Sequence, residues 1–509
     1  MVVLRKVHVR PPKYRISVVG ILSSISILSV ILMVCSIGQL KLFSSGKSPS
    51  STVISPEEFE NPSIRNARNS NSNLDNHKSN NKKHIHNNDT IAYAISLVKC
   101  GDKQTTSAGL IDAALILQHS IHQISRRNYA ISGSRYDYTM IALVHRQAEE
   151  CSHILRTVGF QIHLVDTPID QKQIQNEHLR KSIHREWCCG HDEFIKWYPY
   201  KMTDYLAVVH VDIDFMFLKP MDELFDAIRY PANSLEGRAA RAKILREHPK
   251  DGPLPDRIDA FFTRDWPQVK PGRIPGYQAG FVVIRPDVTV FEELRNIVLT
   301  ETYVADFSRT NGWGGKGYGG FVGAMAMQGL MAYYYDHVRP NTSVELNQCR
   351  YNWMGMDIRY RAQPNFSPHG ANRFLVGKCR NNREECEDCM VTPLQEIRSV
   401  HFTECRKPWN CIGVGVKGGD KGKAIDTAAG SYDKCMEVVT KWHELRRDLE
   451  TKLYDLTLDK RLVIPKTNQY KANIFQGHCT GEGGGNYSQI DASEDTFAMI
   501  PKLYSMEAS

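Results

Sequence analysis

The sequence predicts an α/β domain built around a largely parallel sheet. Short apolar segments with a strand pattern alternate with segments of helical period, which is typical of a parallel α/β sheet. The chain has 509 residues, enough for two average domains or for one large domain with additions. With 41% hydrophobic and 24% charged residues, it can bury a sizeable core.

The N-terminal segment Ile16–Leu40 contains no charged side chain. Its 25 residues can span a bilayer with some tilt, whereas the apolar core of a cleaved signal peptide usually has about 7–15 residues. A retained anchor is therefore favoured over a signal peptide. The basic residues that precede it, with no acidic residue among them, are Arg5, Lys6, Arg10, Lys13 and Arg15. Because basic flanks stay in the cytosol, we expect a cytosolic tail at 1–15, a signal anchor at 16–40 and a lumenal remainder.

These five charges account for most of the formal net charge of +8, so the rest of the chain carries only +3 (8 − 5). Nucleic-acid binding needs a concentrated basic surface, and this excess is too small to form one. The sequence therefore predicts no nucleic-acid partner.

Residues 41–89 are polar and rich in Ser, Asn and Lys. Such a segment cannot bury enough apolar surface to fold, so it is predicted to be a flexible stem. Three N-glycosylation sequons, which begin at Asn88, Asn341 and Asn486, fit the predicted lumenal placement.

Twelve of the 13 cysteines follow the predicted anchor, and Cys35 lies within it. Because the lumen is oxidising, disulfides are expected. The stretch Cys379–Cys411 resembles part of a zinc ribbon, since Cys386 and Cys389 have CxxC spacing. No second CxxC follows, so disulfides are favoured over zinc there.

Local patterns predict the elements of the domain in chain order. Apolar runs predict strands at Ile91–Val98, Tyr138–Val144, Phe160–Val165, Tyr205–Val211 and Gly280–Ile284. Apolar residues at helical spacing predict helices at Gly109–Ile124, Gln147–Val158 and Cys435–Leu453. The domain is expected to cover residues 90–453, and the weakly patterned residues 454–509 are expected to be a C-terminal tail.

Two carboxylates, Asp212 and Asp214, follow the buried strand Tyr205–Val211. Open α/β sheets bind ligands at the carboxyl edge of their strands. Carboxylate oxygens suit hard divalent ions such as manganese or magnesium, which bridge pyrophosphate oxygens and neutralise a leaving group. The alternative is a turn with two solvated acids. The strand before the pair and the segment Leu218–Phe225 after it favour the metal site.

The segment around these aspartates resembles glycosyltransferase family 8, the glycogenin-like enzymes. Three further segments match that family in the same order. Lys196 lies 16 residues before Asp212, at the place of the family's donor-site lysine. Gly276–Pro286 resembles the family's Asn-(Ser/Ala)-Gly strand, and His401–Trp409 resembles its His-Phe-x(4)-Lys-Pro-Trp signature. Together the matches span roughly residues 91–445.

The resemblance implies a GT-A fold, with a Rossmann-like mixed sheet, and a retaining transfer from a UDP-sugar. Manganese accepts mixed oxygen and imidazole ligands, so Asp212, Asp214 and His401 are the expected metal ligands, with magnesium as an alternative ion. Lys407 is implied to contact the diphosphate, and Lys196 to lie near the donor and the leaving group. The expected donor-binding residues are Lys196, Asp212, Gln278, Ala279, Gly280, Gln328 and Lys407.

The segment Gly323–Leu330 resembles the family's Asp-Gln-Gly-Leu helix start. Gln328 is kept, and with Lys196 it is an expected catalytic residue. Met327 replaces the Asp, which is normally a donor-sugar contact. This departure leaves open the identity of the sugar and the level of activity.

The leading hypothesis is a manganese-dependent glycosyltransferase that acts on a glycan, glycoprotein or glycolipid acceptor at a Golgi or other secretory-pathway membrane. A second hypothesis is a catalytically silent member of the family that binds nucleotide-sugars or glycans in the lumen. A third, a metal-dependent phosphodiesterase, would need a second metal and more ligands. A homodimer and the acceptor's identity are left open. A cytosolic glycogen primer is disfavoured by the lumenal placement.

Overall fold

The structure is a computed structural model that describes residues 89–100, 106–186, 190–247, 252–266, 274–306, 310–355, 389–403, 405, 407–410, 429–456, 478, 487–490 and 494–506. The chain divides into two units, Met1–Asn81 and Lys82–Ser509, and all described residues belong to the second. The predicted cytosolic tail and anchor, and the stem up to residue 88, lie outside the described residues. Among the residues that are described, no helix has the length and apolar character needed to cross a membrane.

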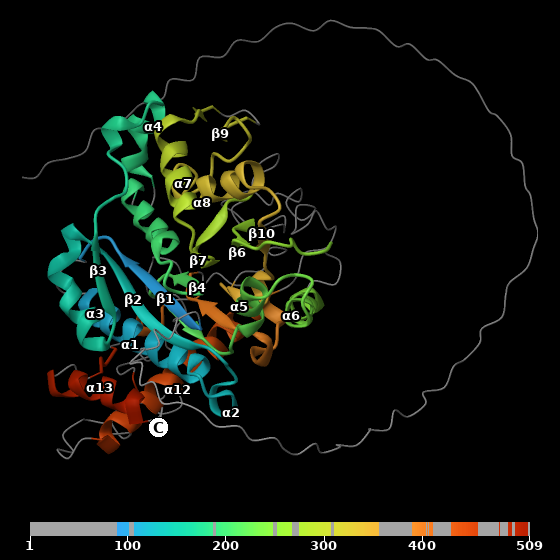
Figure 1. Cartoon of the computed structure of the whole chain (residues 1–509). Coiled ribbons are helices and arrows are strands. Elements are labelled where there is room, and N and C mark those ends of the chain that lie inside the picture. The colour runs from blue at the N-terminus through green and yellow to red at the C-terminus, as the bar shows by residue number, and fades with distance from the viewer. Residues whose placement is uncertain are drawn as a thin grey trace, which may run out of the picture. The chain divides into compact units, whose positions relative to one another are not determined.

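A seven-stranded mixed sheet lies at the centre of this unit, in the order β10-β6-β7-β4-β1-β2-β3 (Figure 1). Its strands are β1 (Thr90–Leu97), β2 (Asp137–His145), β3 (Gln161–Val165), β4 (Ala207–Val211), β6 (Ala260–Arg264), β7 (Tyr277–Ile284) and β10 (Ser343–Glu345). The strands from β4 to β3 run parallel, as predicted. β7 runs antiparallel to both β4 and β6, so the sheet is mixed.

Four short strands form two small sheets beside the main one. β5 (Phe215–Phe217) pairs with β11 (Ser399–His401), and β8 (Tyr303–Val304) pairs with β9 (Gly312–Trp313), both antiparallel. β5 follows β4 after only three residues, so its partner β11 is brought to the edge where β4 ends.

Helices cover both faces of the main sheet. The α-helices are α1 (Thr106–Ser125), α2 (Tyr129–Ser132), α3 (Ser152–Val158), α4 (Glu177–Ser182), α5 (Asp222–Arg229), α6 (Leu235–Arg246), α7 (Val288–Thr300), α8 (Met327–Tyr333), α9 (Gln348–Tyr351), α12 (Ala429–Leu456) and α13 (Glu494–Met506). Among the 3₁₀ segments are η1 (Arg146–Cys151), η2 (Gln171–Gln173), η3 (Ile183–Arg185), η4 (Gly190–Lys201), η8 (Cys389–Val391), η9 (Leu394–Glu396) and η10 (Pro408–Asn410), and η6 (Tyr334–Val338) is a π-helical turn.

The predicted helix Gln147–Val158 is wrong in its first half, where the chain forms the 3₁₀ segment η1 and becomes α-helical only at Ser152. The His145 side chain accepts the Gln147 backbone N–H and starts this tighter turn. The other two predicted helices lie within α1 and α12, and each predicted strand overlaps an observed one.

Alternate residues of β7 enter two different cores, as the period of a strand requires. In β7, Phe281 and Val283 belong to a core shared with α1, α3, α12 and α13, whereas Val282 and Ile284 belong to a core shared with η4, α7 and α8. Figure 1 shows α1, α12 and α13 on one side of the sheet and α7 and α8 on the other.

Part of the segment that was expected to be a C-terminal tail joins the first core, where Ile490, Ile500 and Leu503 are buried. A buried polar network lies beside them. Nδ1 of His443 is 3.2 Å from Nδ1 of His478, and Nε2 of His478 is 2.7 Å from a Glu450 oxygen. In the same network, Arg446 on α12 pairs with Asp112 on α1 at 3.1 Å and with Glu450 at 3.0 Å. This network ties the C-terminal residues to the main sheet through α1.

Among the described residues, three disulfides confirm the expectation of oxidised cysteines: Cys100–Cys151, Cys349–Cys389 and Cys405–Cys435. Cys389, one half of the CxxC pair, is bonded to Cys349, which favours the disulfide interpretation over zinc. Its neighbour Cys386 lies outside the described residues.

Candidate metal centre

Asp212, Asp214 and His401 converge on one point at the carboxyl edge of β4. One ligand atom from each lies within 4.8 Å of the other two. Nε2 of His401 is 3.8 Å from Oδ2 of Asp212 and 3.5 Å from Oδ1 of Asp214. Two ligands that bind one ion at right angles with bonds of about 2.1–2.6 Å are about 3–3.7 Å apart. The three side chains therefore fit a single divalent cation.

The backbone holds these three residues together. His401 is the last residue of β11 and pairs with Phe215 of β5, whose ring stacks on the imidazole at 4.5 Å between ring centres. The backbone N–H of Phe402 donates to the Asp214 carbonyl at 3.0 Å. The last ligand is thus placed by an antiparallel pairing with the strand that follows the first two.

Gly280 on β7 forms the floor of the cluster. Its carbonyl accepts the backbone N–H of Asp212 at 3.1 Å. A Cβ atom at this position would lie 2.5 Å from Cε1 of His401 and 2.7 Å from Oδ2 of Asp212. Only glycine leaves room for both ligands, and the backbone N–H of Gly280 is itself bonded to the Gln278 side chain at 2.7 Å.

A lysine lies beside each carboxylate. Nζ of Lys196, on η4, is 3.0 Å from Oδ1 of Asp212 and 3.3 Å from the Ala279 carbonyl. Nζ of Lys407 donates to Oδ2 of Asp214 and to the Phe402 carbonyl, the latter at 2.6 Å. Each predicted phosphate-binding lysine therefore touches a predicted metal ligand.

Burial and charge set the protonation of the cluster. Burial alone would raise the pKa of the Asp212 carboxyl, but the charge of Lys196, with smaller contributions from His401 and His210, lowers that pKa to about 2. Burial lowers the pKa of the His401 imidazole to about 4, against the opposing effect of Asp212. At neutral pH the cluster thus offers an anionic Asp212 and a neutral imidazole, the forms that bind cations. Burial also lowers the pKa of Lys407, to about 8, so this lysine stays largely charged at pH 7.

The structure brings most of the predicted site residues into one contact network: Lys196, Asp212, Asp214, Gln278, Ala279, Gly280, His401 and Lys407. Gln328 lies one step away, on the first turn of α8, and its side-chain amide donates to the Val322 carbonyl. The start of α8 abuts β7, because a Cβ atom on Gly276 would lie 3.1 Å from the Gln328 carbonyl oxygen. Met327, the residue that departs from the family pattern, is buried and begins α8.

Two acidic residues near the cluster were not found from the sequence. Glu193 is buried and accepts from Nζ of Lys196 at 3.2 Å. Asp265 is buried directly after β6, and its charge acts on His401. Asp265 shares one sequence signal with Asp212, since both follow an apolar strand, but the strand β6 was itself not predicted. Glu193 carries no such signal.

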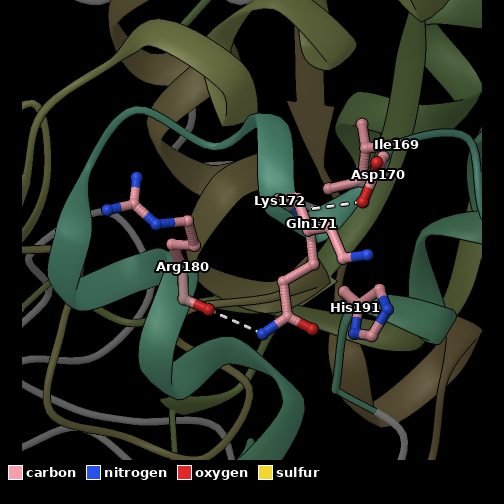
Figure 2. Close-up of a pocket in the computed structure, with 6 residues that line it drawn as sticks. All are labelled: Ile169, Asp170, Gln171, Lys172, Arg180 and His191. Atoms are coloured by element: carbon pink, nitrogen blue, oxygen red, sulfur yellow. Dashed lines mark hydrogen bonds between the residues drawn. The ribbon is translucent and has the colours of Figure 1, made fainter.

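A separate hollow of about 710 Å³ lies beside η2 and α4 (Figure 2). Its lining residues are Ile169, Asp170, Gln171, Lys172, Arg180 and His191, and none of them is a predicted site residue. Polar groups in its wall bond to the chain's own backbone. The Asp170 carboxylate accepts the Lys172 N–H at 2.9 Å, and the Gln171 amide donates to the Arg180 carbonyl at 2.6 Å. These contacts shape the wall of the hollow, and none of its lining residues belongs to the contact network around Asp212.

No protein-family model matches the chain, and no curated protein matches it in sequence. Among solved structures, it is similar to mouse xyloside xylosyltransferase 1 in its apo form, with 11% identity over 63% of this chain and 99% of that one and a TM-score of 0.32. It is also similar to the glycosyltransferase GlyE of Streptococcus pneumoniae TIGR4, with 11% identity over 71% and 64% of the two chains and a TM-score of 0.34. A third structure, the galactosyltransferase LgtC in complex with donor and acceptor sugar analogs, has 11% identity over 68% and 95% of the chains and a TM-score of 0.30. With TM-scores this low, these similarities do not establish a fold or a function for this chain.

Proposed function

We propose that the protein is a manganese-dependent, retaining glycosyltransferase of the GT-A type that transfers a sugar from a UDP-sugar to a glycan, glycoprotein or glycolipid. One observation carries this proposal. Asp212 and Asp214 from the edge of β4 meet His401 from β11 at one point, and Lys196 and Lys407 lie beside the two carboxylates.

The charges of this group suit a sugar diphosphate. The two carboxylates and two ammonium groups of this cluster cancel, so a divalent cation would add about +2 beside the diphosphate, which carries about −2, and the neighbouring Glu193 carboxylate offsets part of that positive charge. The cation would be held by Asp212, Asp214 and His401, and when bound it supplies charge neutralisation to the departing diphosphate. Magnesium is an alternative ion, because two of the three ligands are carboxylates.

The chain's own residues bind and orient the donor. Lys196 and Lys407 each share their ammonium protons with a carboxylate, and a diphosphate oxygen can replace or add to those acceptors. Because Gly280 has no side chain, a ligand can approach the cluster closely from this side. In this scheme the protein contributes mainly positioning and electrostatic stabilisation, and the attack on the same face as departure follows from the family resemblance.

The membrane placement belongs to the same proposal. Residues 16–40 anchor the chain in a Golgi or other secretory-pathway membrane, and the catalytic domain lies in the lumen. The three disulfides support this placement, because disulfides persist in oxidising compartments.

Two other functions are weaker candidates. A two-metal phosphodiesterase would need a second cluster nearby, and among the described residues the other ligand group is Cys100, Glu150 and Cys151, whose cysteines form a disulfide. A silent lumenal binding protein is favoured by one feature, the Met327 side chain at the start of α8, where the family resemblance leads one to expect a carboxylate.

Titration calorimetry with Mn²⁺ and UDP, followed by hydrolysis assays on a panel of UDP-sugars, tests the proposal. The Asp214→Ala variant should lose turnover with every donor while its thermal unfolding stays cooperative. Asp166→Ala is the matched control, because the Asp166 side chain is exposed and pairs only with Arg146 among the contacts described. Binding of Mn²⁺·UDP by the wild-type protein without turnover would favour the silent binding protein. Full activity in Asp214→Ala would refute the metal assignment.

A further inference from the structure

Glu193 connects two parts of the candidate site. Its side chain is only 9% exposed, and it lies on η4 one turn before Lys196. One carboxylate oxygen, Oε1, is 3.2 Å from Nζ of Lys196. The other, Oε2, accepts the backbone N–H of Met327 at 3.4 Å. One buried carboxylate therefore bridges the lysine of the metal cluster and the first residue of α8.

The start of α8 depends on acceptors from outside the helix. Its N-cap residue, Ala326, provides no side-chain cap, although the first N–H groups of a helix need partners. Glu186 accepts the N–H groups of Gly323 and Met325 at 3.1 Å each, and Glu193 accepts that of Met327. Two glutamates, one just before and one within η4, thus accept backbone N–H groups around the start of α8.

Only Glu193 of this pair also holds Lys196. The Lys196 ammonium has three protons, and among the described residues it donates to Glu193, Asp212 and the Ala279 carbonyl. The lysine side chain is 10% exposed, so its charge needs these partners. Removing one of the three would free the ammonium group to shift within the site.

We propose that Glu193 is a positioning residue that fixes the Lys196 ammonium in the geometry needed for sugar transfer. This inference rests on the proposed function. The carboxylate also repels an incoming diphosphate, so it costs affinity for the free nucleotide. The two effects have opposite signs. The negative charge of Glu193 weakens the binding of UDP, whereas the position that Glu193 gives to Lys196 accelerates transfer, because the ammonium group must meet the charge that builds on the diphosphate as the sugar leaves.

The test compares Glu193→Gln with Glu186→Gln in the full-length protein. Both variants remove a carboxylate from the turn before α8, but only the first removes a partner of Lys196. For Glu193→Gln we expect kcat for UDP-sugar hydrolysis to fall at least 10-fold, while the affinity for UDP with Mn²⁺ stays equal or rises. For Glu186→Gln we expect kcat and UDP affinity within 3-fold of wild type, even where the melting temperature falls. Parallel losses of kcat, UDP affinity and melting temperature in Glu193→Gln, or no change in kcat, would overturn the inference.

A double-mutant cycle tests the route of the effect. If Glu193 acts through Lys196, adding Glu193→Gln to Lys196→Met should change kcat less than 3-fold. A further 10-fold loss would mean that Glu193 acts independently, and the inference would fail. If the Glu193→Gln variant does not fold, the Glu193→Asp variant takes its place, because aspartate keeps the charge but withdraws the carboxylate by one methylene. The Glu193→Asp variant should also lower kcat without lowering UDP affinity.

The same measurements separate this inference from the proposed function. A wild-type protein that binds Mn²⁺·UDP but turns over no donor overturns the proposed function, and this inference with it. An active wild-type protein with an equally active Glu193→Gln variant overturns only the inference.

Discussion

The Nζ atom of Lys407 donates a hydrogen bond to Asp214, just as Lys196 does to Asp212, so each carboxylate of the candidate metal centre has its own lysine. The two lysines come from segments far apart in the chain, η4 and the residues after β11. This arrangement means that the lysines compensate the carboxylates before any cation binds. A cation must therefore compete with an ammonium group for Asp214.

That competition predicts opposite effects of Lys407→Met on two ligands. Mn²⁺ alone should bind about 3–10-fold more tightly, because Asp214 no longer shares its charge with an ammonium group. UDP in the presence of Mn²⁺ should bind at least 10-fold more weakly, because a phosphate partner is lost. Calorimetry with and without UDP measures both, and Lys316→Met, at an exposed lysine, is the control. Weaker binding of both ligands would contradict the idea of competition.

Gly280→Ala should disrupt the candidate metal centre although it replaces none of the three ligand residues. The new methyl group would meet His401 and Asp212 at distances shorter than normal contacts, so the ligands must move apart. We expect Mn²⁺ affinity to fall at least 10-fold, and stability to fall by about 1–3 kcal/mol. Gly252→Ala is the control, because a Cβ atom there meets nothing within 4 Å. Unchanged Mn²⁺ affinity in Gly280→Ala would show that the centre is not where the three side chains meet.

The Cys405–Cys435 disulfide ties the segment that follows His401 to α12. Its cysteines are 30 residues apart, so Cys405→Ser with Cys435→Ser should cost about 3–4 kcal/mol of unfolding free energy in denaturant titrations. UDP affinity should fall as well, because Lys407 lies two residues beyond Cys405. Removing Cys349–Cys389 is the comparison, since its loop holds none of the proposed metal or phosphate ligands. If both double variants lower UDP affinity equally, the tether at Cys405 has no special role in the site.

The buried His443 predicts a pH dependence of stability. Burial lowers the pKa of His443 well below its usual value of about 6.5, and also lowers that of His478. In the unfolded chain these imidazoles take up protons below about pH 6.5, whereas the folded chain protonates both less readily and keeps His443 neutral. The unfolded state then binds more protons, so stability falls with pH below about 6.5, by up to about 1.4 kcal/mol per pH unit for each histidine. Asp112 opposes this, because burial raises its pKa to about 6 and its protonation stabilises the folded state as the pH falls.

Comparing wild type with His443→Gln isolates the contribution of this histidine. The variant should be less stable at pH 7.5, and the gap in melting temperature should narrow as the pH falls to 5. Thermal melts across that range check this. A gap that stays constant or widens toward pH 5 would mean that His443 is not held neutral in the folded protein.

The convergence of the three candidate ligands could be predicted in part from the sequence. Asp212 and Asp214 follow an apolar strand, and the family resemblance supplied His401 through its spacing to Lys407 and Trp409. The strand β6 was not predicted, because only its first three residues are apolar. Its last two residues, Thr263 and Arg264, are polar, so the five residues do not form the continuous apolar run expected of a strand that is buried on both faces. The helix predicted from Gln147 was wrong at its start. The spacing of apolar residues does not reveal that the His145 side chain accepts the backbone N–H of Gln147 and begins a 3₁₀ turn there.

Glu193 could not have been predicted from its surroundings in the sequence. Its partner Met327 lies 134 residues away, and neither residue carries a pattern that points to the other. The bond forms because η4 and α8 pack on the same face of the sheet, and that packing is decided by the whole second core rather than by any local segment. The same holds for the C-terminal residues, whose burial depends on α1 and α12 being in place.

The pairing of β11 with β5 has a consequence for how the protein matures. A nascent chain that has reached Glu345 already holds every strand of the seven-stranded sheet, yet only two of the three ligands. Under the proposed function, affinity for the cation would arise only after synthesis has passed His401 and β11 has paired with β5. A ligand stabilises only the form of a protein that binds it. The ion would therefore stabilise chains that have completed this last pairing, and it would not stabilise chains truncated before His401.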